Sequence, residues 1–160
     1  MVALTGFLSS LIVFFSLYSP FASIFHFEGA VPQNLGVSRG HLTSCPQTPN
    51  CVVSNESADE THYIKPMDYD SDRATAKDTL LKVLSVVPNT VVVEETEDYI
   101  RTESRSKIMG FVDDGEFYFP EDKSVIEVRS ASRLGESDLG VNRRRLEQIR
   151  LAIADYNSRG

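Results

Sequence analysis

The stretch V-R-S-A-S-R-L-G-E-S-D-L-G-V-N-R-R-R, from Val128 to Arg145, decides the fold because it leads from the last predicted strand into the last predicted helix. Gly135 and Gly140 can adopt backbone angles closed to other residues, which suits a tight connection. Three arginines, residues 143–145, follow where the helix is expected to begin. A helix start carries partial positive charge and favours acidic residues. These arginines therefore need carboxylate partners or a bound anion.

Four strand-like segments lead up to this stretch, and the last of them runs into it. All four are rich in Val, Ile, Tyr and Phe. They are Thr90–Thr96, Tyr99–Arg105, Phe111–Phe119 and Ser124–Ala131. Their short connections predict antiparallel pairing. Residues Thr61–Met67 predict one more short strand, which Pro66 limits to an edge or an end.

Two amphipathic helices complete the pattern. The first is expected to start at Asp70–Asp72 and to stop before Pro88, with apolar residues at helical spacing. Those residues are Ala76, Leu80, Val83, Leu84 and Val87. The C-terminal helix carries one apolar stripe that is predicted to lie on the sheet. The stripe consists of Leu146, Ile149, Ile153 and Tyr156.

The order of these elements is strand, helix, four strands, helix. It predicts an α+β fold in which a curved antiparallel sheet of four to five strands packs on the C-terminal helix. The order is TATA-binding-protein-like, an analogy that carries no function.

Three motifs in the chain resemble those of one family. They are C-P-Q-T-P-N-C-V-V-S at Cys45–Ser54, F-V-D-D-G-E-F at Phe111–Phe117, and R-S-A-S-R-L-G-E-S-D-L-G-V-N-R-R-R-L at Arg129–Leu146. In this order they resemble the domain of unknown function 1499 family, which occurs in exported or membrane-associated bacterial proteins and in plastids. The resemblance implies no established activity.

The length and charge of the chain limit what it can be. Its 160 residues suffice for one domain with an N-terminal appendage. It has 23 acidic and 16 basic residues and a net charge of −7, which argues against a nucleic-acid partner. The arginines of the last motif are therefore expected to act locally, through specific pairing.

The composition of the N-terminal residues predicts a membrane segment. Met1–Phe27 contains no Asp, Glu, Lys or Arg, and Leu8–Tyr18 forms an apolar core that ends at Pro20. Two readings stay open: a cleaved export signal, and a retained helix from Leu4 to Phe27 that is long enough to span a bilayer. Glu28–Thr43 changes to Gly, Pro, Gln, Asn and Ser, which predicts a flexible tether.

This composition predicts three parts of the chain: a signal peptide or membrane anchor over residues 1–27, a tether over 28–43, and one α+β domain over 44–160. The first arginine is Arg39, whereas a transit peptide is rich in arginine, so direct plastid import is not expected. We expect an exported, membrane-associated protein of a bacterial periplasm or a thylakoid-lumen-like compartment.

Two cysteines, Cys45 and Cys51, are expected to pair because an exported chain meets an oxidising compartment. A redox-active dithiol is one alternative, although it usually has C-x-x-C spacing. A metal site is another, and it would need His41 and His62 as further ligands. Nothing in the histidine spacing supports it, so no metal or other cofactor is expected.

The last two strands set carboxylates against arginines. A two-residue loop of Glu121 and Asp122 would place three pairs opposite each other on one face: Tyr118–Val125, Glu116–Glu127 and Asp114–Arg129. The opposed glutamates require a nearby cation, for which Arg129 and Arg101 are the candidates. The other face would be the core side, with Phe117, Phe119, Ile126 and Val128.

Three readings of the charged residues stay open. In the first, ion pairs fasten the loop to the sheet; its candidate residues are Asp113, Asp114, Glu116, Arg129 and Arg145. In the second, surplus arginines and backbone N–H groups at the helix start bind an anionic headgroup, carboxylate or phosphate. Its candidate ligand-binding residues are Arg133, Gly135, Ser137, Asp138, Gly140, Asn142 and Arg143. In the third, Asp113, Asp114 and Glu116 hold a cation.

The sequence contains no complete catalytic constellation. It lacks G-x-S-x-G and a phosphate-binding loop, and all three histidines precede residue 63. We expect a non-catalytic module that binds an anionic or amphiphilic small molecule, a lipid or a protein partner. The alternative is a hydrolase-like enzyme whose site is assembled across the fold, with His62 beside a serine.

Overall fold

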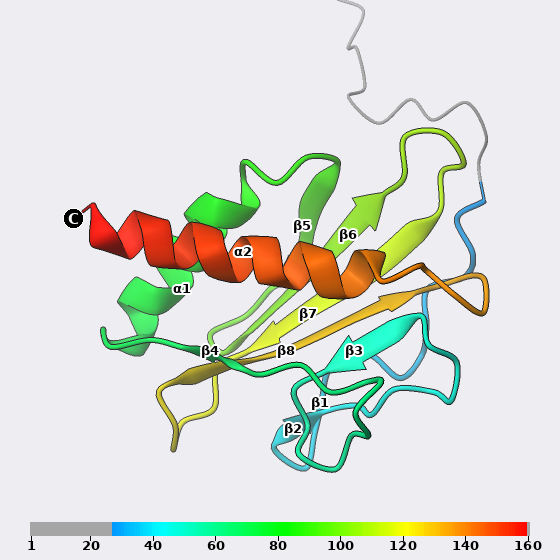
Figure 1. The fold of residues 1–160 in the computed structure, drawn as a ribbon. Helices are drawn as coiled ribbons and strands as arrows, with labels where there is room; N and C mark the ends of the chain where they lie inside the picture. The colour runs from blue at the N-terminus through cyan, green and yellow to red at the C-terminus, as the bar shows by residue number, and fades with distance from the viewer. Residues whose placement is uncertain (1–26, 160) are drawn as a thin grey trace, which may run out of the picture.

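An antiparallel sheet lies against two helices in the computed structural model, which describes residues 27–159 (Figure 1). The strands are β1 (Val37–Ser38), β2 (His41–Leu42), β3 (Cys51–Val53), β4 (Met67–Asp68), β5 (Thr90–Glu95), β6 (Tyr99–Arg105), β7 (Val112–Tyr118) and β8 (Val125–Ser132). The helices are α1 (Arg73–Leu84) and α2 (Val141–Ser158). The α+β class and the C-terminal helix on an antiparallel sheet are thereby confirmed.

The main sheet has the strand order β3-β8-β7-β6-β5, and β4 adds a sixth strand by pairing with β8. This exceeds the four to five strands expected from the sequence. The sequence pattern missed β3, and of the strand expected over residues 61–67 only a bridge between Val53 and Tyr63 and the short β4 are formed. β3 has only three residues and follows a proline-rich loop, so it is too short to show the alternation of apolar and polar residues that marks a strand.

Each helix starts and packs for a local reason. Asp72 caps α1, because its carboxylate accepts a hydrogen bond of 2.9 Å from the Thr75 backbone N–H. Ala76, Leu80, Val83 and Leu84 of α1 are buried as expected, and Val87 lies beyond its end and packs partly on the core.

Helix α2 buries Leu146, Ile149 and Ile153. The predicted stripe fails at Tyr156, which is 44% exposed. Its ring lies 5.6 Å from the ammonium group of Lys82 on α1 instead of on the sheet. The reason is that the C-terminal half of α2 runs beside α1 (Figure 1).

The helix-covered face of the sheet is the apolar core. Ile100, Phe117 and Val128 come from three neighbouring strands and meet Leu80 and Ile149 of the helices. The four residues predicted to share the core face are all buried in this cluster: Phe117, Phe119, Ile126 and Val128. The alternation of the strands therefore assigned the faces correctly.

The register of β7 and β8 differs from the predicted one by two residues. Tyr118 lies opposite Glu127, Glu116 opposite Arg129, and Asp114 opposite Ala131. The connection is longer than the predicted two residues, because β7 ends at Tyr118 and β8 begins only at Val125. A shift of two preserves the faces and replaces the predicted opposition of two glutamates with an ion pair.

Residues 27–43, which we call the strap, lie across the opposite face of the sheet. The Gly36 N–H donates to Glu116 Oε1 of β7 at 2.6 Å, and Leu42 packs with Tyr99 and Tyr118. The turn between β1 and β2 uses Arg39 and Gly40, both with positive φ, as a tight hairpin requires. The segment predicted as a flexible tether is therefore part of the folded domain.

A disulfide joins Cys45 and Cys51 with an S–S distance of 2.11 Å. It ties the residues that follow the strap to β3, whose register partner is the C-terminal part of β8. Within residues 27–159, no helix is both long and apolar enough to cross a bilayer. The predicted membrane segment, apart from Phe27, lies outside the described residues.

Candidate functional site

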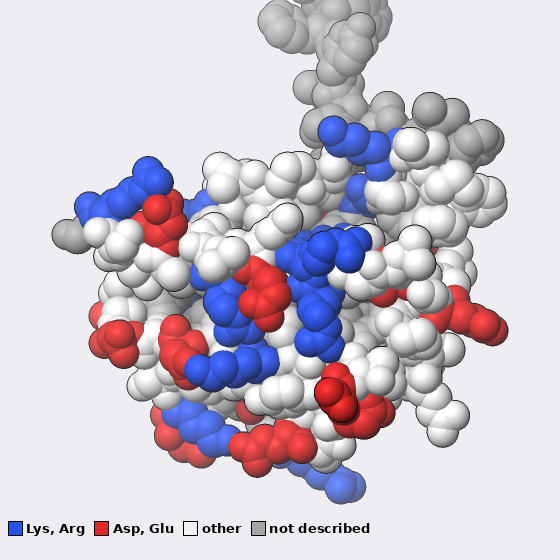
Figure 2. All heavy atoms as spheres, viewed as in Figure 1, with Lys and Arg blue, Asp and Glu red and all other residues white. Residues whose placement is uncertain are grey.

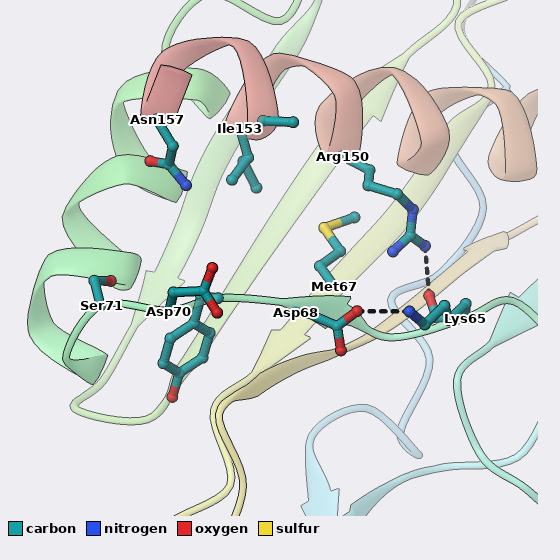
Figure 3. Close-up of a pocket in the computed structure, with 10 residues that line it drawn as sticks. Lys65, Met67, Asp68, Asp70, Ser71, Arg150, Ile153 and Asn157 are labelled. Carbon is teal, nitrogen blue, oxygen red and sulfur yellow. Dashed lines mark hydrogen bonds and ion pairs between the residues drawn. The ribbon is translucent and has the colours of Figure 1, made fainter. Parts of the chain in front are cut away.

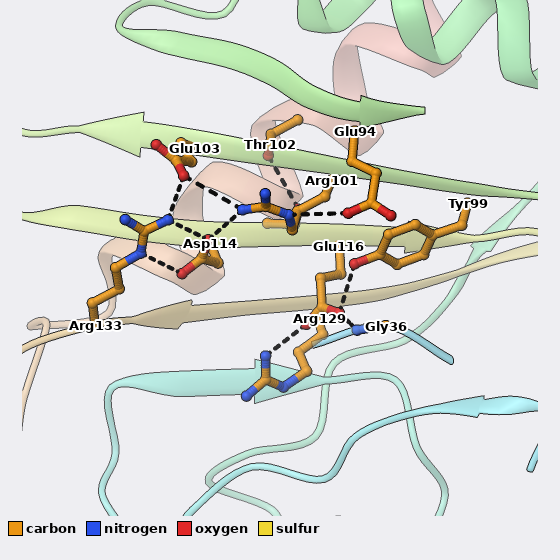
Figure 4. A network of polar contacts seen from close by, with 11 residues as sticks. Gly36, Glu94, Tyr99, Arg101, Thr102, Glu103, Asp114, Glu116, Arg129 and Arg133 are labelled. Carbon is orange, nitrogen blue, oxygen red and sulfur yellow. Dashed lines mark hydrogen bonds and ion pairs between the residues drawn. The ribbon is translucent and has the colours of Figure 1, made fainter. Parts of the chain in front are cut away.

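The strap-covered face of the sheet carries a network of ion pairs (Figure 4). It is formed by three acidic and three basic side chains of β6, β7, β8 and the residue after β8, which we call the charged network. Its members are Arg101, Glu103, Asp114, Glu116, Arg129 and Arg133.

Asp114 is the centre of one half of this network. Its carboxylate is almost fully buried and accepts two hydrogen bonds from Arg133, from Nε at 2.7 Å and from Nη2 at 2.8 Å. Arg101 Nη1 lies 3.2 Å from the same carboxylate, and Glu103 contacts both arginines. The hydrogen bonds from Arg133 to Asp114 and Glu103 raise the pKa of the Arg133 guanidinium despite its burial. Arg133 is thus held as a charged donor by two carboxylates, through its Nε and Nη2 atoms.

Glu116 is the centre of the other half. This carboxylate is completely buried and accepts hydrogen bonds from Arg129 Nη1 at 2.6 Å, from the Tyr99 hydroxyl at 2.9 Å and from the Gly36 N–H at 2.6 Å. Burial and the charge of Glu116 raise the pKa of Tyr99, so its hydroxyl stays protonated as a donor. Three donors from three distant segments therefore compensate one buried charge.

The connection from β8 to α2 holds its own carboxylate. Asp138 accepts hydrogen bonds from the backbone N–H groups of Gly140 at 2.9 Å and of Asn142 at 2.7 Å. Its Oδ2 also accepts from the Asn142 side chain at 2.8 Å. The partial positive charge of the helix start is thus met by a residue of the loop itself. In the anion-binding hypothesis, these N–H groups at the start of α2 would bind the ligand.

A second group of polar side chains lies under the start of α2, on the helix side of the sheet. Arg145 donates to Asp113 at 2.7 Å, and Ser132 donates to the same carboxylate at 2.6 Å. Asn142 is completely buried and donates to Ser132 and to the Asn50 carbonyl. These contacts fasten the start of α2 to β7, β8 and the residue before β3.

The remaining arginines of the motif are also occupied. Arg143 donates to the backbone carbonyls of Tyr63 at 2.7 Å and Thr61 at 2.9 Å. Arg144 donates to the Leu139 carbonyl at 2.8 Å.

The candidate ligand-binding residues do not converge on one point. Arg133 lies in the charged network on the strap side, whereas Asn142 lies buried on the helix side. Ser137 accepts a hydrogen bond from the Leu139 N–H within its own loop, and the Gly135 carbonyl accepts one from Asn50. The candidate ion-pair residues, in contrast, are all paired: Asp113 with Arg145, Asp114 with Arg133, and Glu116 with Arg129.

Among residues 27–159, no serine is hydrogen-bonded to the His62 ring. Its Nδ1 lies 2.9 Å from Asp59, and its Nε2 lies 3.2 Å from the Thr48 carbonyl, so both ring nitrogens are used. The hydrogen bond with His62 lowers the pKa of Asp59. Among the described residues, no group of three or more His, Cys, Asp or Glu side chains is placed to hold a metal ion.

A cleft of about 530 Å³ opens where the strap, the loop after β3 and the end of the β7–β8 connection meet. We call it the His41 cleft; it is lined by His41, Ser54, Asn55, Glu56, Ser57, Tyr63, Pro66, Lys123, Val125 and Glu127. His41 Nδ1 lies 3.2 Å from the buried carboxylate of Glu127. Among the described residues, neither His41 Nε2 nor Lys123 Nζ has a hydrogen-bond partner. The cleft was not predicted from the sequence, because its lining comes from four separate segments of the chain.

A second hollow of about 690 Å³ lies between α2 and the segment around β4 (Figure 3). Both of its basic groups, Arg150 and Lys65, are engaged with the protein. Arg150 donates to Glu147 at 2.9 Å and to the Pro66 carbonyl at 2.7 Å, and Lys65 pairs with Asp68 at 2.6 Å. Over the face that carries α2, basic and acidic side chains lie close together (Figure 2). The His41 cleft is therefore the better candidate site.

The fold, together with the ion pairs of the motif at residues 129–146, defines an α+β domain with buried arginine–carboxylate pairs. The chain belongs to the family described as "Protein of unknown function (DUF1499)", whose model matches residues 41–153. Searches of curated proteins and of solved structures found no match.

Proposed function

We propose that this chain is a membrane-tethered, non-catalytic module on the exported side that binds an amphiphilic anion in the His41 cleft. The supporting observation is the lining of the cleft. Lys123 and His41 offer nitrogen donors with no partner among the described residues, and Tyr63, Pro66 and Val125 form an apolar wall beside them. An anionic head and an apolar tail need these two surfaces side by side.

The location rests on two features of the chain. Residues 1–27 contain no charged side chain, which suits an apolar environment. The Cys45–Cys51 disulfide suits an oxidising compartment such as a periplasm or a thylakoid-lumen-like space. Membrane fractionation with N-terminal sequencing tests the tether. A wholly soluble mature protein that begins near Ser23 or Val31 would contradict it.

Ligand binding is tested by thermal unfolding of the full chain, purified in a neutral detergent, with decanoate as the probe. A ligand at about a hundred times its dissociation constant stabilises the folded state by roughly 2.7 kcal/mol. We expect decanoate to raise the melting temperature and octyl glucoside, which lacks the anionic head, to leave it unchanged. Failure of decanoate to stabilise the chain would rule out the amphiphilic anion.

Two substitutions localise the probe. Lys123→Ala and His41→Ala should each reduce the stabilisation by decanoate, because each removes a donor of the cleft. Lys82→Ala is the matched control, since Lys82 is exposed on α1 and does not line the cleft. An equal loss of stabilisation in all three variants would indicate a general charge effect and not a site.

One observation favours an enzyme as a second candidate. A buried carboxylate orients one nitrogen of an imidazole, as Glu127 does with His41, when the other nitrogen acts as a general base. Among the described residues, however, no serine hydroxyl is hydrogen-bonded to the His41 ring. Incubation with p-nitrophenyl butyrate separates the two functions. Turnover that disappears in His41→Ala would replace the binding module with a hydrolase.

A further inference from the structure

The connection between β6 and β7, residues 106–111, presents apolar side chains to the outside. Its sequence is S-K-I-M-G-F, and Ile108 is 61% exposed, with Met109 and Phe111 exposed beside it. Gly110 has a φ of 70°, which allows the chain to turn at this point. The connection contains no acidic residue and one cation, Lys107. Contiguous exposed apolar side chains of this kind mark an interaction surface.

Residues from two other segments extend this surface. The Phe27 N–H donates to the Met109 carbonyl at 3.2 Å, and the rings of Phe27 and Phe111 lie 5.8 Å apart between centroids. Gly29 lies against Leu134, because a Cβ atom at position 29 would be 2.9 Å from Leu134 Cγ. We call these exposed apolar residues the apolar tip: Phe27, Ile108, Met109, Phe111 and Leu134.

The position of the apolar tip in the chain indicates its partner. The described chain begins at Phe27, inside the tip, and the 26 residues before it carry no Asp, Glu, Lys or Arg. The first described residues and the β6–β7 connection lie at the same end of the molecule (Figure 1). A segment suited to a bilayer is therefore attached directly to an apolar surface of the domain.

We propose that the apolar tip rests in the interfacial region of a lipid bilayer, with Ile108 among the acyl chains and Lys107 at anionic headgroups. This inference rests on the membrane tether of the proposed function. Apolar side chains of surface-bound segments enter the boundary between headgroups and acyl chains, and adjacent Lys or Arg residues strengthen binding to anionic lipid. The tip thus fixes the orientation of the domain, which a tether alone would leave free.

The absence of tryptophan from the sequence makes a direct test available, because Ile108→Trp introduces a unique fluorophore. The full chain is reconstituted into vesicles of phosphatidylethanolamine and phosphatidylglycerol whose acyl chains carry bromine, a contact quencher. We expect a blue shift of the emission and a strong loss of its intensity. Leu151→Trp is the matched control, since Leu151 is equally exposed but lies on α2, and it should keep its intensity.

The outcomes separate the inference from the tether. If the chain does not sediment with the vesicles, both fail. If it sediments and Ile108→Trp is quenched no more than Leu151→Trp, the tether stands and the docked tip is wrong. A blue shift that depends on protein concentration and not on lipid would assign the tip to protein contact and overturn the inference. Adding Lys107→Glu should reduce the quenching, and unchanged quenching would contradict the headgroup contact.

Discussion

The two faces of one sheet are buried by different means. On the helix side, Phe117 and Val128 contact apolar residues of α1 and α2, whereas on the strap side their neighbours Glu116 and Arg129 form an ion pair. Apolar burial is non-directional, so many shapes of similar volume satisfy it. An ion pair in a dry environment requires each donor at a particular place. The comparison shows that one strand can stabilise the fold through the apolar side chains of one face. The charged side chains of its other face then fix the position of the groups that they bind.

On the strap side, the energetic cost of burying charged groups makes the position of each hydrogen-bond donor important. Removing a carboxylate and a guanidinium from water is expensive, and their attraction compensates only when every lone pair is used. Glu116 accepts three hydrogen bonds, while Arg129 Nε is the one buried side-chain nitrogen or oxygen of the described residues without a partner. We therefore infer that the charged network positions the strap and the register, and that the helix side supplies most of the stability.

The largest predicted effect comes from Arg129→Ala, which breaks the charged face. It leaves the Glu116 carboxylate buried without its cation, at an expected cost of about 3–5 kcal/mol in the free energy of unfolding. Urea unfolding measures this change. Arg144→Ala is the control, because Arg144 is exposed and bonds only to the Leu139 carbonyl, and it should cost about 0–1 kcal/mol. Equal stabilities of the two variants would mean that the pair is not buried in solution.

The second largest effect is expected from the disulfide, which constrains the strap side of the sheet. Replacing Cys45 and Cys51 by Ala opens a loop with a sequence separation of 6, and the expected loss is roughly 2 kcal/mol. Hydrogen exchange should rise at Gly36 and Leu42, whereas amides under α2 should change less. If exchange rises equally on both faces, the two faces do not unfold independently and the comparison fails. Mass spectrometry of the non-reduced wild type confirms that the bond is present.

Conservative changes compare the tolerance of the two faces. Ile126→Val removes one methyl group from the apolar core and should cost about 0.5–1.5 kcal/mol. Arg129→Lys keeps the charge but loses the planar fork, so it should cost more than Ile126→Val. The same urea titration ranks both variants. The reverse order would show that charge and not geometry holds the strap side.

The smallest effect is expected at the start of α1, on the helix side, and it depends on pH. Hydrogen bonds from the Thr75 hydroxyl and N–H lower the pKa of Asp72 below 3.8. A depressed pKa stabilises the fold above the unfolded pKa, and this contribution is lost as the pH falls through the folded pKa. Asp72→Ala should thus be less stable than wild type at neutral pH and equal to it in strong acid. Asp70→Ala, which leaves the Asp72 cap of α1 in place, should match wild type at both pH values.

The sequence predicted the elements that depend on local pattern. Tyr99–Arg105 matches β6 at both ends, and the other three strands differ by one or two residues at their ends. Alternation in these strands separates Phe117 from Glu116, so the two faces could be assigned before the structure. The β7–β8 register could not, because alternation does not show the length of the connection, which spans residues 119–124 and not the two residues expected.

The candidate site depended on contacts that no local pattern contains. Arg133 was predicted as a ligand residue because it flanks the glycine loop without an obvious partner, yet Glu103, 30 residues away, and Asp114 on β7 bind it. Asp138 was expected to contribute to a ligand site, and its carboxylate accepts hydrogen bonds from the N–H groups of Gly140 and Asn142 at the start of α2. The His41 cleft was missed because His41 and Glu127 are 86 residues apart and meet only after the strap has crossed the sheet.

The strap also shows that the folded domain extends beyond the family match. The family match starts at residue 41, but the Gly36 N–H completes the hydrogen bonding of Glu116, and Glu28 pairs with Arg105 at the far end of β6. A chain cut at the edge of sequence similarity would therefore lose a donor to a buried charge while keeping every motif residue. Recombinant work on this domain should start before residue 27, because here similarity in sequence ends inside a cooperative unit of folding.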